Sequence, residues 1–230
     1  MRIAALVALT LLVAGCTHPV NGGSPQTQTS TPATSGTSAV SPTSPSGSKP
    51  PAASTPPGSG APISDVIAWI EAGHAADPGR YHSATREGVT TQLGADIAFA
   101  APGGKPNCMT DVKHTGSALA CLVDLTNPPA RPETAYGEWK AGWVDFDGVH
   151  LQVGSARADP GPFVNGNGPD LANGDTLSFD EYRCRADQAG LFCVNYAHQS
   201  AAKFSATGIE PYGCLQSVPP PDGVGTAFSC

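Results

Sequence analysis

The sequence predicts a mainly β fold, with α+β as the alternative: a single disulfide-stabilised antiparallel β domain opened by one short N-terminal helix. Charged residues make up only 13% of the chain, whereas its 230 residues include 27 glycines and 23 prolines. Such a composition fits turn-rich β structure better than a helical bundle. Asp147-Gly148 stands between two apolar runs, which is a strong signal for a β-hairpin. Six cysteines follow in the last two thirds of the chain.

The helix is expected at Ser64–Ala72, because apolar residues recur there at helical spacing. Ser64 is expected to cap its start and Gly73 to end its last turn. Trp69 is interpreted as a packing residue. The apolar stripe that would lie on a sheet consists of Ile63, Val66, Ile67 and Ile70.

Strands are expected wherever apolar runs end at turn-forming residues. A long Gly/Pro/Asn loop is expected over residues 154–174, and an irregular, disulfide-stapled tail over residues 212–230. The runs interpreted as strands are Ala95–Ala101, Ala118–Leu125, Glu138–Phe146, Val149–Val153, Leu177–Arg185 and Leu191–Tyr196.

Trp139 and Trp143 are the candidate ligand-binding residues, since both lie on one face of the expected strand Glu138–Phe146. A pair of tryptophans on one strand face packs into a core more often than it binds sugar. An exposed pair would form a platform for glycan, so the sequence leaves both interpretations open.

Cys108, Cys121, Cys184, Cys193, Cys214 and Cys230 make an even set, which in an exported chain indicates three disulfides. Six cysteines allow 15 connectivities. We expect neighbours to pair: Cys108–Cys121, Cys184–Cys193 and Cys214–Cys230. A metal site is the alternative, but the chain has no CxxC pair. We therefore expect neither a metal nor another cofactor.

The N-terminus has the features of an export signal. Arg2 precedes Ile3–Val13, an apolar run that is too short to span a bilayer but suits a signal peptide. The run ends in Val13-Ala14-Gly15-Cys16, which resembles the lipobox of bacterial lipoproteins. The resemblance implies that residues 1–15 are removed and that acyl chains such as palmitate are joined to Cys16. It places the mature protein on the outer face of the cell membrane, held by its lipid.

Residues 16–62 are expected to form a disordered tether behind the lipidated cysteine. The segment is dominated by Ser, Thr, Pro and Gly, and Lys49 is its only charged residue. Such a chain buries too little apolar surface to offset the entropy of ordering. As a flexible coil it would span about 40 Å. Its composition also resembles O-glycosylated stalks.

The globular part is expected over residues 63–230, and it is acidic. Removing Arg2 and Lys49 from the 12 basic residues leaves ten against 19 acidic ones, a net charge of −9. This charge argues against nucleic acid and against an anionic membrane surface as partners. Cell-wall glycan, lipid or another envelope protein remain as candidates.

A second resemblance lies in the last third of the chain. The segment 171–195 includes Tyr182-Arg-Cys184 and Gly190-Leu-Phe-Cys193-Val-Asn195. It is similar to a module of secreted and lipidated actinobacterial proteins, notably mycobacterial ones. Those proteins continue with a Gly-Phe stretch, where this chain has Ala201-Ala202-Lys203-Phe204. The resemblance indicates an origin and implies no activity.

The sequence carries no strong catalytic motif. It lacks GxSxG, HExxH, a P-loop and GxGxxG, although a serine triad without the elbow and a pair of turn carboxylates for glycoside hydrolysis stay open. The carboxylates considered are Asp145, Asp147, Asp180 and Glu181. We expect a non-catalytic binding or structural role at the cell envelope. The alternative is a small extracytoplasmic hydrolase.

Overall fold

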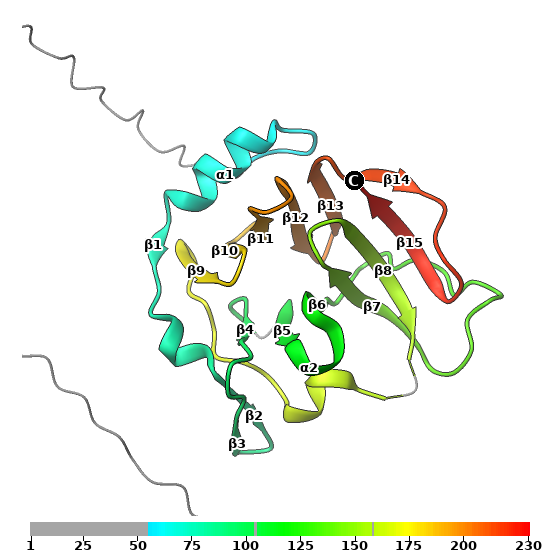
Figure 1. Cartoon of the computed structure of the whole chain (residues 1–230), viewed down its shortest axis with the longest axis horizontal. Coiled ribbons are helices and arrows are strands. Elements are labelled where there is room, and N and C mark those ends of the chain that lie inside the picture. Colours follow the sequence, from blue (N-terminus) through cyan, green and yellow to red (C-terminus); the bar gives the residue numbers. More distant parts are fainter. Residues whose placement is uncertain (1–54, 104, 158) are drawn as a thin grey trace, which may run out of the picture. The chain divides into compact units, whose positions relative to one another are not determined.

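The computed structural model describes residues 55–103, 105–157 and 159–230 (Figure 1). The expected signal peptide, Cys16 and nearly all of the expected tether lie outside these residues. No helix in the described part of the chain is long and apolar enough to cross a membrane.

The structure is mainly β and almost wholly antiparallel, as the composition predicts. The six-stranded sheet has the order β1-β9-β10-β11-β12-β13 and the seven-stranded sheet the order β14-β15-β8-β7-β6-β5-β4. Among the strand pairs of the described residues, only β1 and β9 run in parallel. The first sheet contains β1 (His74–Ala75), β9 (Asp175–Phe179), β10 (Tyr182–Asp187), β11 (Gly190–Asn195), β12 (Ser200–Ser205) and β13 (Gly208–Gly213). The second contains β4 (Ala98–Ala100), β5 (Asn107–Asp111), β6 (Gly116–Leu122), β7 (Trp139–Phe146), β8 (His150–Ala156), β14 (Gln216–Val218) and β15 (Val224–Ser229).

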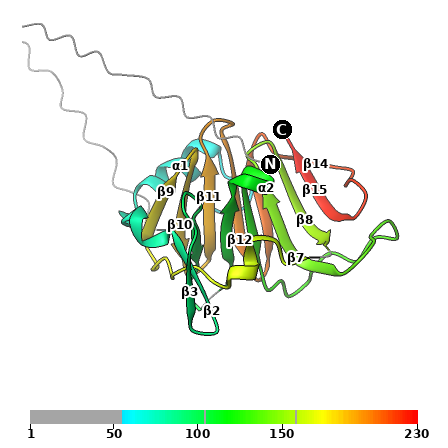
Figure 2. The ribbon, with the colours of Figure 1, turned by 60° about the horizontal axis from the view of Figure 1, so that its bottom comes forward.

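The two sheets pack face to face, and the main core lies between them (Figure 2). Each sheet also has a covered outer face. The helix α1 (Ile63–Glu71) covers the six-stranded sheet through Trp69, which is 1% exposed and lies 4.8 Å from the ring of Phe192. The 3-10 turn η2 (Gly161–Asn165) and the hairpin β2 (Ser83–Arg86) and β3 (Val89–Gln92) lie at the outer face of the seven-stranded sheet.

The strands β4–β8 and β9–β13 form two meanders with the same register. In each, a disulfide joins the second strand to the third at directly opposite residues. The same cross-strand row reads Phe99, Cys108, Cys121, Val144 and Val153 in one meander, and Leu177, Cys184, Cys193, Ala202 and Pro211 in the other. The sequence shows the repeat as Cys-x-x-Asp followed by Leu-x-Cys.

The three disulfides are Cys108–Cys121, Cys184–Cys193 and Cys214–Cys230, the neighbour pairing expected from the sequence. The first two are buried in the core between the sheets. The third ties the end of the chain to Cys214, beside the turn between β7 and β8. This position follows from the backbone N–H of Cys230, which donates to Val149 O at 2.9 Å.

The start of α1 differs from the expectation. The N-cap position is Pro62, so the prediction that Ser64 caps the helix is wrong. Ser64 lies in the first turn instead, and its hydroxyl donates to Asp65. The C-terminal end is as expected, because the backbone N–H of Gly73 donates to Ile70 O at 3.2 Å.

Three predictions of secondary structure need correction. The expected strand Leu177–Arg185 is two strands, β9 and β10, which the Asp180-Glu181 turn separates. The expected irregular tail contains β14 and β15. The fold also has further short helices, α2 (Val112–Thr115) and the 3-10 turns η1 (Pro78–Tyr81) and η2, where the sequence predicts a single helix. The hairpin around Asp147-Gly148 is confirmed as β7 and β8.

Candidate functional site

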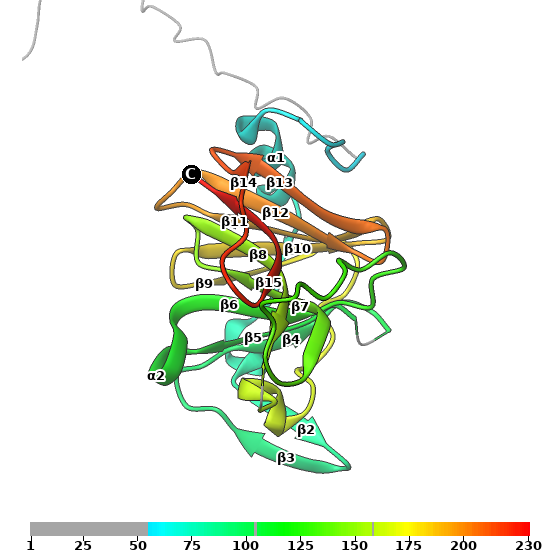
Figure 3. The same ribbon diagram turned by 90° about the vertical axis from the view of Figure 1, so that its right-hand side faces the viewer.

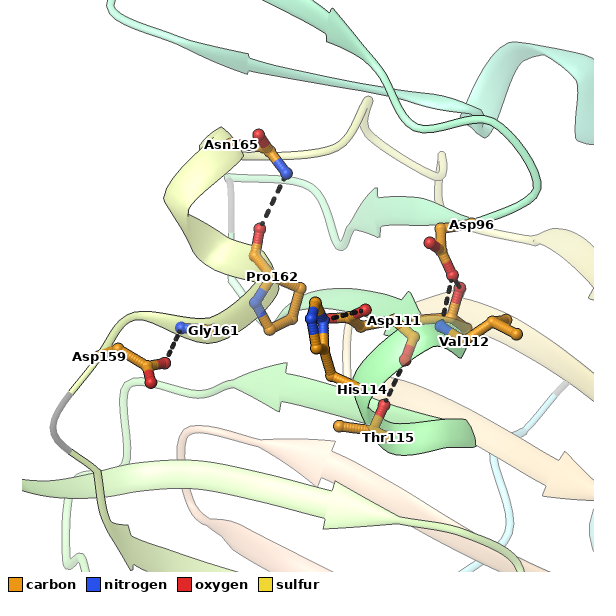
Figure 4. A network of polar contacts seen from close by, with 10 residues as sticks. Asp96, Asp111, Val112, His114, Thr115, Asp159, Gly161, Pro162 and Asn165 are labelled. Carbon is orange, nitrogen blue, oxygen red and sulfur yellow. Dashed lines mark hydrogen bonds and ion pairs between the residues drawn. The ribbon is translucent and has the colours of Figure 1, made fainter. Parts of the chain in front are cut away.

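An open groove of about 710 Å³ lies on the outer side of the seven-stranded sheet, and it is the candidate site (Figure 4). Its volume lies in the range of small-molecule sites, about 300–1,000 Å³. One wall comes from β5 and α2, and the opposite wall from η2 and the residues before it. The end of β3 contributes the rest of the lining, together with Leu93 and Asp96.

Asp96 is fixed on the first wall by two hydrogen bonds to one of its oxygens. The Thr110 hydroxyl donates to Asp96 Oδ1 at 3.0 Å, and the backbone N–H of Val112 donates to the same atom at 2.8 Å. The Thr110 hydroxyl also accepts a bond from Ile97 N at 2.9 Å. This hydroxyl is therefore part of the framework, and the carboxylate keeps its second oxygen available to the groove.

Asp111 and His114 form the most chemically distinctive pair of the groove. Nδ1 of His114 lies 2.8 Å from each carboxylate oxygen of Asp111. The Asp111 side chain is 17% exposed and that of His114 is 65% exposed. Because a hydrogen bond on Nδ1 directs the proton of a neutral imidazole there, Nε2 is left as an acceptor at the groove. The Thr115 hydroxyl donates to Asp111 O at 3.0 Å.

The second wall is built by a proline-rich turn. Asp159 accepts a bond from Gly161 N at 2.8 Å and so fixes the entry into η2. The Asn165 amide donates to Pro162 O, which leaves its carbonyl oxygen free. Beneath the turn, Phe163 packs edge-on against Trp143 with ring centroids 5.0 Å apart.

Arg157 is the only arginine or lysine of the lining, and it is already paired. Its guanidinium donates to Asp145 Oδ2 at 2.6 Å and lies over the Trp143 ring, 4.2 Å from the centroid. The Trp143 indole N–H donates to the other oxygen of Asp145 at 2.9 Å. The Asp145 carboxylate thus offsets the arginine charge, and the groove retains the charges of Asp96, Asp111 and Asp159.

The candidate tryptophans do not form a sugar platform. Trp143 is 1% exposed and packs under η2 and Arg157, which fits the core interpretation of this residue. Trp139 is half-buried, and its ring packs where Gly154 leaves room beside Pro129. A two-residue bulge in β7 between Lys140 and Val144 separates the two tryptophans.

Two of the four carboxylates that the sequence offered for hydrolysis, Asp145 and Asp147, are engaged in structural contacts. Asp145 holds Arg157, and Asp147 caps the β7–β8 turn by accepting bonds from the N–H groups of Val149 and His150. Burial raises the pKa of Asp147, but these bonds and His150 outweigh it, so its pKa lies below the usual value. Within residues 55–103, 105–157 and 159–230, no three His, Cys, Asp or Glu side chains are placed to hold a metal.

Sequence reasoning missed the groove because its residues come from separate segments. Asp96, Asp111 and Asp159 belong to three segments, each an ordinary turn or strand end by pattern. One signal was present: Asp111 and His114 lie in the long stretch between the expected strands 95–101 and 118–125, whereas the other cysteine hairpin has a short turn. Comparison with protein-family models, curated proteins and solved structures finds no match for the chain.

Proposed function

We propose that this chain is a cell-envelope lipoprotein, anchored through Cys16, whose folded part binds a ligand in the groove without catalysis. The lipobox resemblance and the three disulfides support an exported, oxidised protein. The observation that carries the binding role is the groove itself, which combines a ligand-sized volume with fixed acceptor groups.

The hydroxyl groups of the α2 wall favour binding over nucleophilic catalysis. Thr110 and Thr115 use their hydroxyls in bonds to Asp96 and to the backbone of Asp111. A nucleophile needs a base within hydrogen-bond reach. In these two side chains the hydroxyl protons point to structural acceptors instead.

The second candidate function is a small extracytoplasmic hydrolase, and one observation favours it. The Asp111–His114 pair has the carboxylate–imidazole geometry with which hydrolases orient a general base. Such a base would act on a water molecule. Hydrolysis of p-nitrophenyl esters that is abolished by His114→Gln and retained in His150→Gln would support the hydrolase and contradict the binding proposal.

The binding proposal is tested by mass spectrometry of small molecules retained by the full-length protein from its native envelope. Val164→Trp places a large ring at the groove, whereas Val89→Trp adds the same ring to the hairpin tip, where Val89 is 67% exposed. We expect one retained compound class in the wild type and in Val89→Trp, and its loss in Val164→Trp. The same compounds on all three proteins would overturn the assignment of the groove.

A further inference from the structure

Comparison of the two meanders shows that α2 is present in the first and has no counterpart in the second. Asp111 and Asp187 occupy the same place, three residues after the first cysteine of each disulfide. From there, residues 112–118 lead to Leu119 in the first meander, but only residues 188–190 lead to Leu191 in the second. The longer connection contains α2 and a break in the register beside Thr110 and Asp111.

The short connection shows that the disulfide-linked hairpin needs no helix. Asp187 closes its turn by accepting a bond from Ala189 N at 2.9 Å. In the first meander, Asp111 contacts the imidazole of His114 instead. None of the residues of α2 is buried, so the insertion adds nothing to the core. His114 and Thr115 of α2 line the groove together with Asp111.

The groove carries three carboxylates, whereas its side-chain donors outside the α2 wall, apart from the paired Arg157, are the neutral groups of Thr91, Gln92 and Asn165. Acceptors that keep free capacity are the second oxygens of Asp96 and Asp159, the further lone pairs of the two Asp111 oxygens, Nε2 of His114 and the amide oxygen of Asn165. The Arg157 charge is offset by Asp145. Apolar groups complete the lining through Leu93, Met109, Pro160, Pro162 and Val164. A ligand that matches this surface carries hydrogen-bond donors and a positive charge on an aliphatic body.

We infer that α2 is a recognition insertion, and that Asp111, held by His114, binds the ammonium group of an aliphatic amine in the groove. This inference rests on the proposed binding function and names its ligand class. An ammonium group has three donors and no acceptor, which complements the carboxylates. His114 acts as a positioning residue, because its Nδ1–H holds the Asp111 carboxylate in the wall.

The test is a titration of the isotope-labelled protein with 1,5-diaminopentane, followed by amide chemical shifts. The neutral 1,5-pentanediol and the dianion glutarate have the same chain length and serve as ligand controls. We expect the diamine alone to shift amides of residues 91–96, 109–115 and 159–165. Asp111→Asn should weaken binding about tenfold, since a charge-assisted hydrogen bond is lost. His114→Gln should weaken it less, through the loss of the Asp111 orientation.

Matched variants separate this effect from a general change of charge. Asp222→Asn removes an exposed carboxylate on the β14–β15 turn, and His150→Gln alters the other Asp-x-x-His pair. Both should bind the diamine like the wild type. Equal weakening in Asp222→Asn and Asp111→Asn would show non-specific attraction and overturn the inference.

A segment replacement tests whether α2 serves recognition only. Residues 112–118 are replaced by Gln-Ala-Gly, the sequence of residues 188–190. We expect a folded protein with three disulfides and no groove response to the diamine. A variant that fails to form Cys108–Cys121 would contradict the claim that α2 is an insertion that folding does not need. A variant that folds and still binds the diamine would contradict the role of α2 in recognition.

The ligand controls test the amine separately. Amide shifts in the groove with the diol or with glutarate would contradict the assignment of an amine ligand but leave the proposed binding function in place. Groove shifts with none of the three probes, together with no retained compound from the envelope, would remove both proposals.

Discussion

At the residue scale, the contacts around Gly148 join the two sheets. The Ser200 hydroxyl donates to Gly148 O, and the Tyr182 hydroxyl donates to Phe146 O at 2.9 Å. The Asn195 side chain packs against the same turn. The Asp-Gly signal predicts the hairpin from local preference, but it carries no information on these partners, which are 36 to 52 residues away in the sequence.

Gly148→Ala is expected to destabilise the fold by about 1–3 kcal/mol. Gly148 has a φ of +93°, and an added Cβ would lie 2.5 Å from Cγ of Asn195. Gly88→Ala is the matched control, because Gly88 has a φ of +82° in another hairpin with open space around it. Urea denaturation of both variants separates the backbone strain from the clash. Equal losses of unfolding free energy in the two variants would mean that the contact with Asn195 does not affect stability.

Tyr182 is expected to make stability sensitive to alkaline pH. Burial, and then the charges of Asp147 and Asp180, raise the pKa of its hydroxyl above the usual 10.0, although a hydrogen bond with Asn195 opposes them. Since the folded-state pKa is raised, the contribution is complete below pH 10 and is lost as pH rises further. The free energy of unfolding should therefore fall above pH 10, by up to about 1.4 kcal/mol per pH unit.

Tyr182→Phe should lower the free energy of unfolding at pH 7 by about 1 kcal/mol. It should also make the fall of that free energy with pH less steep above pH 10. Some slope should remain, because burial also raises the pKa of Tyr81 and Tyr212. Tyr136→Phe is the control, as its side chain is 89% exposed. Denaturant titrations from pH 7 to 11 give both quantities. An unchanged slope in Tyr182→Phe would contradict the argument.

At the element scale, β7 and β8 show which kind of strand a local pattern predicts. β7 and β8 were found because Val144, Phe146 and Leu151 mark them clearly. β12 was missed because its buried residues are mostly small, as in Ser200-Ala201-Ala202. β9 and β10 were joined because their turn uses Asp180 at a φ of +42° rather than a glycine. The groove depends on the packing of β3, β5, α2 and η2, which no local pattern encodes.

The disulfides are expected to differ in how much they stabilise the fold, according to how deeply each is buried. The pairs Cys108–Cys121 and Cys214–Cys230 have sequence separations of 13 and 16 residues, so the chain-entropy model gives each about 3 kcal/mol. Only the first lies in the core, where replacement of both sulfurs by alanine also leaves a cavity. Cys108→Ala/Cys121→Ala should therefore lose more stability than Cys214→Ala/Cys230→Ala in urea denaturation. The reverse order would contradict a core role for the first disulfide.

At the scale of the whole molecule, α1 and the groove belong to opposite outer faces of the sandwich (Figure 3). The described chain enters through α1, which packs on the six-stranded sheet, whereas the groove lies over the seven-stranded sheet. The segment that precedes α1 in the sequence therefore joins the folded part on the face away from the groove.

Anchoring and binding are therefore expected to be separable. Cys16→Ala should move the protein from the membrane to the soluble fraction of the native host, because the sulfur that would carry the acyl chains is gone. Thr17→Ala, a change at the next residue, should stay with the membrane and incorporate labelled palmitate. The released Cys16→Ala protein should bind 1,5-diaminopentane as tightly as the anchored form, since residues 91–165 build the whole groove. Cys16→Ala that remains with the membrane would contradict the lipid anchor, and weakened binding in the released protein would mean that the N-terminal segment contributes to the site.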